Sequence, residues 1–209
     1  MPPRIHNTLS YSLAAVVFLC VMPWERAAAA LVAALWVFHF ARRTLESLFV
    51  HRYSGRRVPP ADYWVEYAYY GGFAAAIAWA VGQAGWALPR AWPTLLGVGV
   101  FLGGEAGNAW AHQKLRALRS APGEVRKQVP HGGTFEWVSC PHYLFEITSW
   151  AGFALVTRVL PAYVFLALGA GIVTSYAFAR HRKYKAEFDG QDGKELYPKG
   201  RRAIFPGIF

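Results

Sequence analysis

Apolar residues are grouped in six runs along the chain, and polar segments separate them. The runs cover residues 9–23, 27–41, 63–84, 93–111, 143–157 and 160–179. A membrane-crossing helix takes about 20 residues, so the first two runs are short and would have to include polar residues at their ends. The pattern predicts an all-α fold: a polytopic membrane bundle of about six transmembrane helices, with a single domain over residues 1–209.

The basic residues lie on alternate sides of this predicted bundle. If the N-terminus is in the cytosol, every one of the 22 Lys and Arg residues falls on the cytosolic side except Arg26, Arg90 and Arg158. Cytoplasmic segments of membrane proteins carry such an excess of Lys and Arg. The distribution therefore predicts that both termini are cytosolic.

The composition separates this chain from soluble domains. Hydrophobic residues make up 55% of it and charged residues 16%, whereas about 25% of residues are charged in soluble domains. The net charge of +10 fits contact with anionic membrane lipids, so no nucleic-acid partner is expected. The first run also has features of a signal peptide, with Arg4 before it and alanines after it, but a second apolar run follows at once and favours a retained helix.

Motifs of several common sites are absent from the sequence. It contains no G-x-G-x-x-G, no G-x-x-x-x-G-K-[ST] and no H-E-x-x-H. Cys20 and Cys140 are too few for a disulfide framework or a zinc site, and the histidines lack the spacing of metal ligands. We expect no metal, and any nucleotide would bind without a Rossmann unit.

The stretch 129–150 joins a polar turn to an apolar run that contains Glu146. A carboxylate inside a membrane-length segment is costly, so it indicates a partner or a functional role. Tyr143 lies three residues earlier and shares a helix face with Glu146. We expect both to be catalytic. Tyr70 is a further catalytic candidate, although an aromatic belt at the membrane surface would also explain it.

A polar stripe follows one face of the run 93–111. Glu105, Asn108 and His112 recur at helical spacing, and Arg116 and Arg119 extend the stripe toward the cytosol. A ligand with a neutral head and an anionic tail would suit this face. The alternative is a hydrogen-bonded contact between helices, which the glycines nearby would allow.

Further charged residues lie where the chain leaves the apolar runs. Arg42, Arg43 and Glu46 are spaced for an ion pair on one helix, or for a membrane-boundary anchor. After the last run, Arg180 and Tyr184 can share one side of a helix, where they could pair with phosphates and stack on an adenine. A tail that binds lipid phosphates is the alternative.

Several segments resemble a known family. The run GGTFEWVSCPHYLFEITSWAGFALVT is similar to the C-terminal part of the steroid 5α-reductase family, and GNAWAHQKLRALRSAPG, RHRKYKAEF and YPKGRRAIFPGIF follow the same pattern. The segments RRTLESLFVHRYSG and YAYYGGFAA are most similar to the branch of very-long-chain trans-2-enoyl-CoA reductases. The resemblance extends from about residue 39 to residue 209, in the same order.

This resemblance implies NADPH-dependent reduction of a carbon–carbon double bond conjugated to a carbonyl in a lipid substrate. A trans-2-enoyl-CoA is the expected substrate, with a 3-oxo-4-ene steroid or a polyprenol-type lipid as the alternative. By the same resemblance, Asn108 and Glu146 would hold the nicotinamide end of NADPH. The rest of the implied cofactor site comprises His112, Arg119, His142, Arg180, Tyr184 and Arg201.

One departure from the family pattern concerns the carbonyl donor. Family members place a tyrosine where this chain has Phe40, and a phenyl ring cannot donate a hydrogen bond. The glutamate that steroid reductases use on an earlier helix also has no counterpart. Tyr143 is our expected replacement, with Tyr69 or Tyr70 as the next candidates. His39 could also serve, although a lone histidine on an apolar face is more often simply packed.

Two other functions stay open at this point. A membrane methyltransferase that uses S-adenosylmethionine would share the bundle and the combination of Pro141, Tyr143 and Glu146. A non-catalytic relative that binds lipid would explain Phe40. An active reductase would be an integral membrane protein of the endoplasmic reticulum in a eukaryote, or of the inner membrane in a bacterium. Its active site would be open to the cytosol, and its partners could include an elongation complex.

Overall fold

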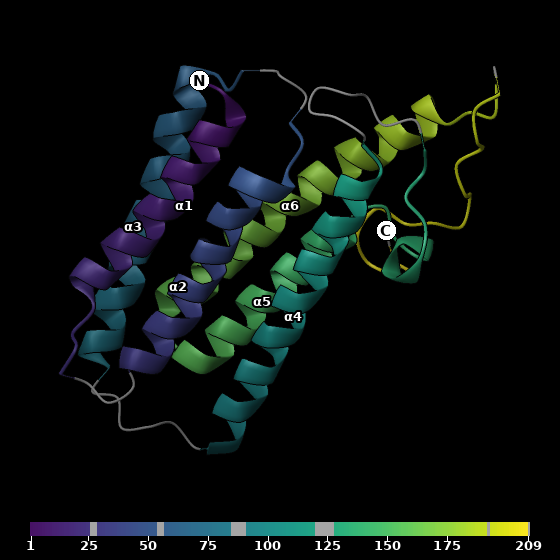
Figure 1. Cartoon of the computed structure of the whole chain (residues 1–209). Helices are drawn as coiled ribbons and strands as arrows, with labels where there is room; N and C mark the ends of the chain where they lie inside the picture. Colours follow the sequence, from purple (N-terminus) through teal and green to yellow (C-terminus); the bar gives the residue numbers. More distant parts are fainter. Residues whose placement is uncertain (26–28, 54–56, 85–90, 120–127, 192, 209) are drawn as a thin grey trace.

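Six long helices form one bundle in the computed structural model (Figure 1). The structure describes residues 1–25, 29–53, 57–84, 91–119, 128–191 and 193–208. No strand forms in these ranges, which contain only two isolated β-bridges. The predicted all-α fold is confirmed, and its helices are α1 (Pro3–Val21), α2 (Ala29–Leu45), α3 (Pro60–Gln83), α4 (Ala91–Ala117), α5 (Pro141–Thr157) and α6 (Leu160–Glu187).

Two short helical turns complete the secondary structure. The π-helix η1 (Glu46–Val50) follows directly on α2, and the 3-10 helix η2 (Gly133–Glu136) precedes α5. A π-turn is rare and often marks a functional site. Here it buries its first two residues, Glu46 and Ser47, inside the bundle.

Proline defines where four of the long helices begin. Pro3, Pro60, Pro141 and Pro161 all lie in the first two positions of a helix. The first amides of a helix have no partner within it, so the missing N–H of proline costs nothing there. The sequence therefore fixes these starts locally.

The helices extend beyond the apolar runs at their polar ends. α2 continues to Leu45, α4 to Ala117 and α6 to Glu187, all past the limits of the predicted runs. The added turns are stabilised by polar contacts between helices, such as those of Arg42 and Arg43 with carboxylates. Hydrophobicity alone could not predict these turns.

Aromatic side chains fill the centre of the bundle. Trp36 is fully buried and stacks on Phe18 of α1, with the ring centroids 4.7 Å apart. It also lies 5.4 Å from Trp150 of α5 and 5.7 Å from Phe165 of α6. Around this core, α1 packs on α2 and α3, α5 on α4 and α6, and α3 on α6 (Figure 1).

Glycines allow α4 and α5 to approach very closely. A Cβ atom on Gly104 would lie 2.4 Å from the backbone nitrogen of Ser149, and one on Gly152 would lie 2.3 Å from that of Phe101. Small residues at such contacts let two helix backbones meet. The close approach brings the polar stripe of α4 against the face of α5 that carries Glu146.

Two of the described helices, α1 and α6, are long and apolar enough to cross a membrane. This agrees with a membrane protein, while crossing by all six helices remains a prediction. The start of α1 and the end of α6 lie at the same end of the bundle in Figure 1, as the expected topology requires. Cytosolic termini likewise remain a prediction, and Arg26 and Arg90 lie outside the described residues.

Candidate active site

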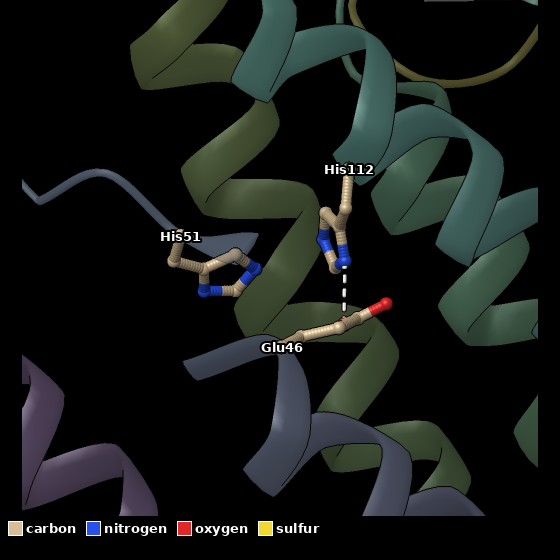
Figure 2. Close-up of side chains that lie close together, drawn as sticks. All are labelled: Glu46, His51 and His112. Atoms are coloured by element: carbon tan, nitrogen blue, oxygen red, sulfur yellow. Dashed lines mark hydrogen bonds and ion pairs between the residues drawn. The ribbon is translucent and has the colours of Figure 1, made fainter. Parts of the chain in front are cut away.

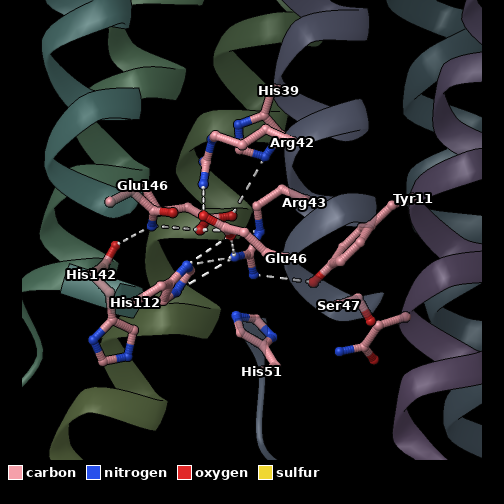
Figure 3. Close-up of polar contacts among 12 residues, drawn as sticks. Tyr11, His39, Arg42, Arg43, Glu46, Ser47, His51, His112, His142 and Glu146 are labelled. Carbon is pink, nitrogen blue, oxygen red and sulfur yellow. Dashed lines mark hydrogen bonds and ion pairs between the residues drawn. The ribbon is translucent and has the colours of Figure 1, made fainter. Parts of the chain in front are cut away.

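A group of charged side chains lies inside one end of the bundle, between α2, η1, α4 and α5 (Figure 3). Burying charges is costly unless they are paired and hydrogen-bonded. Each member meets at least one oppositely charged or imidazole partner within the group. We refer to it as the charged cluster, which comprises His39, Arg42, Arg43, Glu46, Glu105, His112 and Glu146.

Two neighbouring arginines of α2 connect the carboxylates of the cluster. Arg42 donates from Nε to Oε2 of Glu105 at 2.7 Å, and from Nη1 to Oε1 of Glu46. Arg43 donates to Oε2 of Glu46 at 2.7 Å, and its Nε lies 4.0 Å from Oε2 of Glu146. The arginines thereby link α2 to α4 and α5.

His39 lies between two carboxylates. Its Nδ1 is 2.7 Å from Oε1 of Glu105, and its Nε2 is 3.8 Å from Oε1 of Glu146. The imidazole also packs against the ring of Trp150, with the centroids 4.4 Å apart. The structure thus gives this histidine polar partners on both ring nitrogens, in place of the purely packed histidine considered from the sequence.

Asn108 fixes the start of α5 and the carboxylate of Glu146. Its Nδ2 donates to the carbonyl oxygen of His142 at 2.7 Å and to Oε2 of Glu146 at 3.2 Å. The Oδ1 of this fully buried side chain has no hydrogen-bond partner among the described residues. A buried acceptor without a partner is costly, so a ligand with an amide N–H fits this position.

Electrostatics keep Glu46 ionised. Burial raises the pKa of this carboxyl, but the hydrogen bond and charge of His112 and the charges of Arg43 and Arg42 outweigh burial and hold the pKa well below its usual range. His112 lies close enough to donate, with Nδ1 at 2.8 Å from Oε2 of Glu46. Glu46 is therefore the anionic centre that the two arginines and the histidine share.

Glu46, His51 and His112 also have the chemistry of metal ligands (Figure 2). One ligand atom from each lies within 4.8 Å of the others. However, Arg43 donates to the same oxygen of Glu46 and lies 3.0 Å from Nδ1 of His112. A fixed guanidinium at this position opposes a divalent cation, so this group fits a metal poorly.

Tyr143 lies on α5, beside the cluster. Its ring is 4.1 Å from that of His142 and 6.4 Å from that of Tyr176 on α6. It packs against Cys140 and Ile204, next to the C-terminal segment. No hydrogen bond between Tyr143 and the charged cluster appears among the described residues.

Tyr70, on α3, lies among other aromatic rings. Its ring is 5.4 Å from that of Phe40 and 5.9 Å from that of Tyr11, both edge-on. Phe40 is itself buried, at 1% exposure. The structure thus separates the two tyrosines that the sequence put forward: Tyr70 faces the bundle core, and Tyr143, at the start of α5, faces α6 and the C-terminal segment.

Two of the predicted cofactor arginines, at the polar end of the bundle, lie near enough for their charges to interact. Arg119 donates to the carbonyl oxygen of Arg52. Burial and the charge of Arg180 both lower the pKa of Arg119. Two guanidinium groups drawn together repel each other, and an anion such as a phosphate relieves this repulsion.

The other predicted cofactor residues have structural contacts. His142 lies 5.6 Å from His112, ring to ring. Tyr184 is buried and stacks on Tyr197 at 5.7 Å. Arg201 is buried and donates to the carbonyl oxygen of Pro130 at 2.9 Å. Tyr184 and Arg201 therefore hold the C-terminal segment against the loop before α5.

Sequence reasoning missed Tyr11. This residue lies in the first apolar run, and its hydroxyl accepts a hydrogen bond from Nη2 of Arg43 at 3.2 Å. Ser10 and Ser12 flank it in the sequence, but no charged residue lies near it to mark a site. Only the packing of α1 on α2 reveals it.

Comparison with known proteins identifies the family to which the chain belongs. The family profile for 3-oxo-5-alpha-steroid 4-dehydrogenase matches residues 61–209. The very-long-chain enoyl-CoA reductase of Dictyostelium discoideum is 34% identical over 168 residues, which are 80% of this chain and 54% of that protein. A probable very-long-chain enoyl-CoA reductase of Caenorhabditis elegans is 35% identical over 83% of this chain and 56% of its own length.

Steroid enzymes match a shorter part of the chain. The 3-oxo-5-alpha-steroid 4-dehydrogenase 2 of Homo sapiens is 40% identical over 114 residues, which are 54% of this chain and 42% of that enzyme. The chain spans about half the length of the curated relatives it matches. The resemblance inferred from the sequence motifs is confirmed: the chain belongs to the 3-oxo-5-alpha-steroid 4-dehydrogenase family, whose named relatives are very-long-chain enoyl-CoA reductases and steroid 5α-reductases.

Proposed function

We propose that this chain is an NADPH-dependent membrane reductase that saturates a double bond conjugated to a carbonyl, with a trans-2-enoyl-CoA as substrate. The observation that carries the proposal is the arrangement of Asn108 and Glu146. The glycine-mediated contact of α4 and α5 holds Asn108 against Glu146 of the charged cluster and leaves a buried acceptor on Asn108.

The residues around Asn108 fit a nicotinamide. The carboxamide of the coenzyme carries an NH₂ group, which could donate to Oδ1 of Asn108 and to Glu146. Arg119 and Arg180 supply positive charge for the phosphates at the cytosolic end. When bound, NADPH would supply the hydride for the double bond.

The protein contributes orientation and charge. Glu146 is held by Asn108 at 3.2 Å, with His39 and Arg43 about as near as a salt bridge allows, at 3.8 and 4.0 Å. Of these groups, the guanidinium of Arg43 would stabilise the negative charge that develops on the carbonyl oxygen during reduction. Burial of the cluster excludes water and strengthens the effect.

Two observations favour a thioester substrate over a steroid. The enoyl-CoA reductase relatives match 80% and 83% of this chain, whereas the human steroid enzyme matches 54%. The segment 42–57 is basic, and coenzyme A has phosphates for such a surface, which a steroid lacks. The thioester and the steroid are both lipid substrates. If the substrate is the enoyl thioester, partners in an elongation complex are expected as well.

Purified protein in detergent provides the direct test. NADPH oxidation is measured with a trans-2-enoyl-CoA and, separately, with a 4-ene-3-keto steroid. We expect turnover of the thioester. Glu146→Gln should lower kcat/KM and the thermal protection by NADPH together, because Glu146 is placed at the nicotinamide. Tyr143→Phe is run in parallel, since Tyr143 was the donor expected from the sequence.

The control variant also replaces a glutamate by glutamine, but at a position away from the charged cluster. Glu195 forms an exposed pair with His131 at 2.6 Å, so Glu195→Gln should leave activity unchanged. Turnover of the steroid alone would keep the coenzyme site and replace the substrate. Thermal protection by S-adenosylmethionine instead of NADPH would identify a methyltransferase, and protection without any turnover a non-catalytic relative.

A further inference from the structure

The helical turn η2 and the C-terminal segment form a small cap beside the bundle, next to the upper part of α4 (Figure 1). We refer to residues 133–139 and 198–208 as the cap. The ring of Phe135 lies 5.7 Å from that of Trp110 on α4. A Cβ atom on Gly133 would lie 2.8 Å from the ring of Trp110, so this close contact requires glycine. The cap is therefore packed directly on α4.

Backbone hydrogen bonds join the two parts of the cap. The amide of Arg202 donates to the carbonyl oxygen of Trp137 at 2.9 Å, and the amide of Ser139 donates to that of Arg202 at 2.8 Å. The preceding residue, Arg201, is buried and donates to the carbonyl oxygen of Pro130. The fold thus holds the backbones of Trp137 and Arg202 side by side, independently of their side chains.

A hollow of about 460 Å³ opens on the surface of the cap, and Glu136, Trp137 and Arg202 are among the residues that line it. Trp137 is 64% exposed, and its indole makes no hydrogen bond or ring contact among the described residues. Arg202 is exposed as well, and its side chain has no hydrogen bond or ion pair in the part of the chain that the structure describes. A carboxylate, a guanidinium and an indole are thus available to one ligand.

The carboxylate of Glu136 is fixed and ionised. Its Oε1 accepts from the amide of Gly132 at 2.6 Å, and its Oε2 accepts from Nη2 of Arg201 at 3.5 Å. The hydrogen bond from Gly132 and the charges of His131 and Arg201 hold the pKa of this carboxyl below its usual value. The side chain is still 48% exposed. A carboxylate offers about four acceptor sites, so Glu136 can also accept from a ligand.

The neighbouring helix indicates where the hollow lies relative to the membrane. Large apolar side chains of α4, such as Trp92, Leu95 and Leu102, are exposed. An exposed apolar surface of this kind suits contact with lipid chains. The cap packs on Trp110, close to the basic last turn of the same helix. Indole rings such as that of Trp137 are enriched at this level, where lipid chains meet the headgroups.

We propose that the cap binds the headgroup of a membrane phospholipid that carries both a phosphate and a primary ammonium group, as in phosphatidylethanolamine. The guanidinium of Arg202 pairs with the phosphate, which it matches in charge and geometry. The ammonium group donates to the carboxylate of Glu136. The indole of Trp137 covers the region between the headgroup and the acyl chains. This site requires that α4 crosses the membrane, and it is independent of the proposed reductase function.

The two opposite charges of the hollow discriminate between lipids. The carboxylate of Glu136 repels an anionic headgroup that has no ammonium group, such as phosphoglycerol. A phosphocholine headgroup is cationic at its end, but its trimethylammonium group has no N–H to donate. The combination of Glu136 and Arg202 therefore favours ethanolamine over glycerol and choline headgroups.

Native mass spectrometry of the purified protein in detergent measures this binding directly. The protein is titrated separately with phosphatidylethanolamine, phosphatidylglycerol and phosphatidylcholine, and the apparent Kd is taken from the lipid-bound and lipid-free populations. We expect phosphatidylethanolamine to bind about threefold or more tightly than the other two, as for one partly exposed charge pair. Arg202→Gln should weaken the binding of all three lipids by about fivefold or more, because each has a phosphate.

Lys199→Gln is the matched control. It removes an exposed positive charge from the same segment, but Lys199 does not line the hollow, so each Kd should stay within about twofold. Glu136→Gln should abolish the preference for phosphatidylethanolamine, while phosphatidylglycerol still binds. Equal losses in Arg202→Gln and Lys199→Gln would show general attraction to basic charge and overturn the site. Equal Kd values of the three lipids in the wild type would overturn it as well.

Two further measurements exclude other causes. Glycerophosphoethanolamine has the headgroup without acyl chains and should compete weakly, because the chains hold the lipid against α4. Its displacement of phosphatidylethanolamine at equal concentration would replace the lipid by a soluble phosphodiester. The thermal unfolding midpoint of Arg202→Gln in lipid-free detergent should equal that of the wild type, since this side chain has no hydrogen bond or ion pair among the described residues. Loss of lipid binding in this variant then reflects the site and not the fold.

Discussion

At the scale of single residues, Glu46 determines whether the charged cluster holds together. Its two carboxylate oxygens meet Arg42, Arg43 and His112, and the residue is 5% exposed. Glu46 is the only carboxylate residue in α2 and η1. The sequence spacing predicted the ion pairs with the arginines of α2, but not the contact with His112 of α4.

Substitution of Glu46 by glutamine should strongly destabilise the protein. Glu46→Gln leaves two buried guanidinium groups short of a counter-charge, and breaking a buried ion pair costs about 3–5 kcal/mol. The measurement is the free energy of unfolding by denaturant in detergent micelles. Glu195→Gln, which breaks an exposed pair, should cost less than about 1 kcal/mol. Similar losses in both variants would contradict a central role for Glu46.

The same residue predicts how stability depends on pH. The pKa of Glu46 is lower in the folded state than in the unfolded chain, where it is about 4.3. Its charge therefore contributes full stability at neutral pH, and this contribution is lost as the pH falls below the unfolded value toward the folded one. Unfolding free energies measured between about pH 5 and 3 should fall more steeply in the wild type than in Glu46→Gln. Parallel slopes would show that other groups dominate.

At the scale of helices, the contact of α4 and α5 brings the parts of the site together. Gly104 and Gly152 let the two backbones meet, and Asn108, one turn after Gly104, then reaches Glu146 at 3.2 Å. The sequence offered two interpretations of the polar stripe on α4, a ligand-binding face or a contact between helices. The structure combines them, because the stripe is the helix contact and also supplies Asn108.

A methyl group at this contact should separate the helices. Gly104→Ala would place a Cβ 2.4 Å from a backbone nitrogen of α5, and such overpacking costs about 1–3 kcal/mol. Gly103→Ala is the matched control, because nothing lies within 4 Å of a Cβ there, and alanine in a helix stabilises by up to about 1 kcal/mol relative to glycine. We expect opposite shifts of the thermal unfolding midpoint. If the proposed coenzyme site is right, only Gly104→Ala also weakens NADPH binding.

At the scale of the whole molecule, the bundle separates an apolar body from a basic end. Arg42 and Arg43 lie in the last turn of α2, Arg119 lies just after the end of α4, and Arg180 lies about two turns before the end of α6. This arrangement agrees with a cytosolic polar end.

The topology prediction can be tested in cells. A reporter fused after Phe209 should be active in the cytosol, because the positive-inside rule places the C-terminal end of α6 there. A second reporter, inserted at Arg158 between α5 and α6, should map to the other side. If both reporters lie on the same side, α6 does not cross the membrane and the six-helix topology is wrong.

Local features of the sequence determined the helices and the family. Apolar runs are local features, so they predicted six helices. The prolines at four helix starts are local as well, although the predicted runs for α1, α3 and α5 begin a few residues after the proline. The family motifs are contiguous and could be recognised in the same way. The helix ends were less predictable, because α2 and α4 extend through polar turns that only contacts with other helices stabilise.

Only the tertiary structure decided which polar side chains meet. Periodicity shows that Glu105, Asn108 and His112 share a face of α4, but not that His39, Glu46 and Glu146 approach that face from other helices. Tyr11 is the clearest case, since the serines beside it in the sequence do not reveal its contact with Arg43 of another helix. The physical reason is that spacing along one helix fixes a direction from its own axis, whereas a contact between helices also depends on how close they pack and how each is rotated.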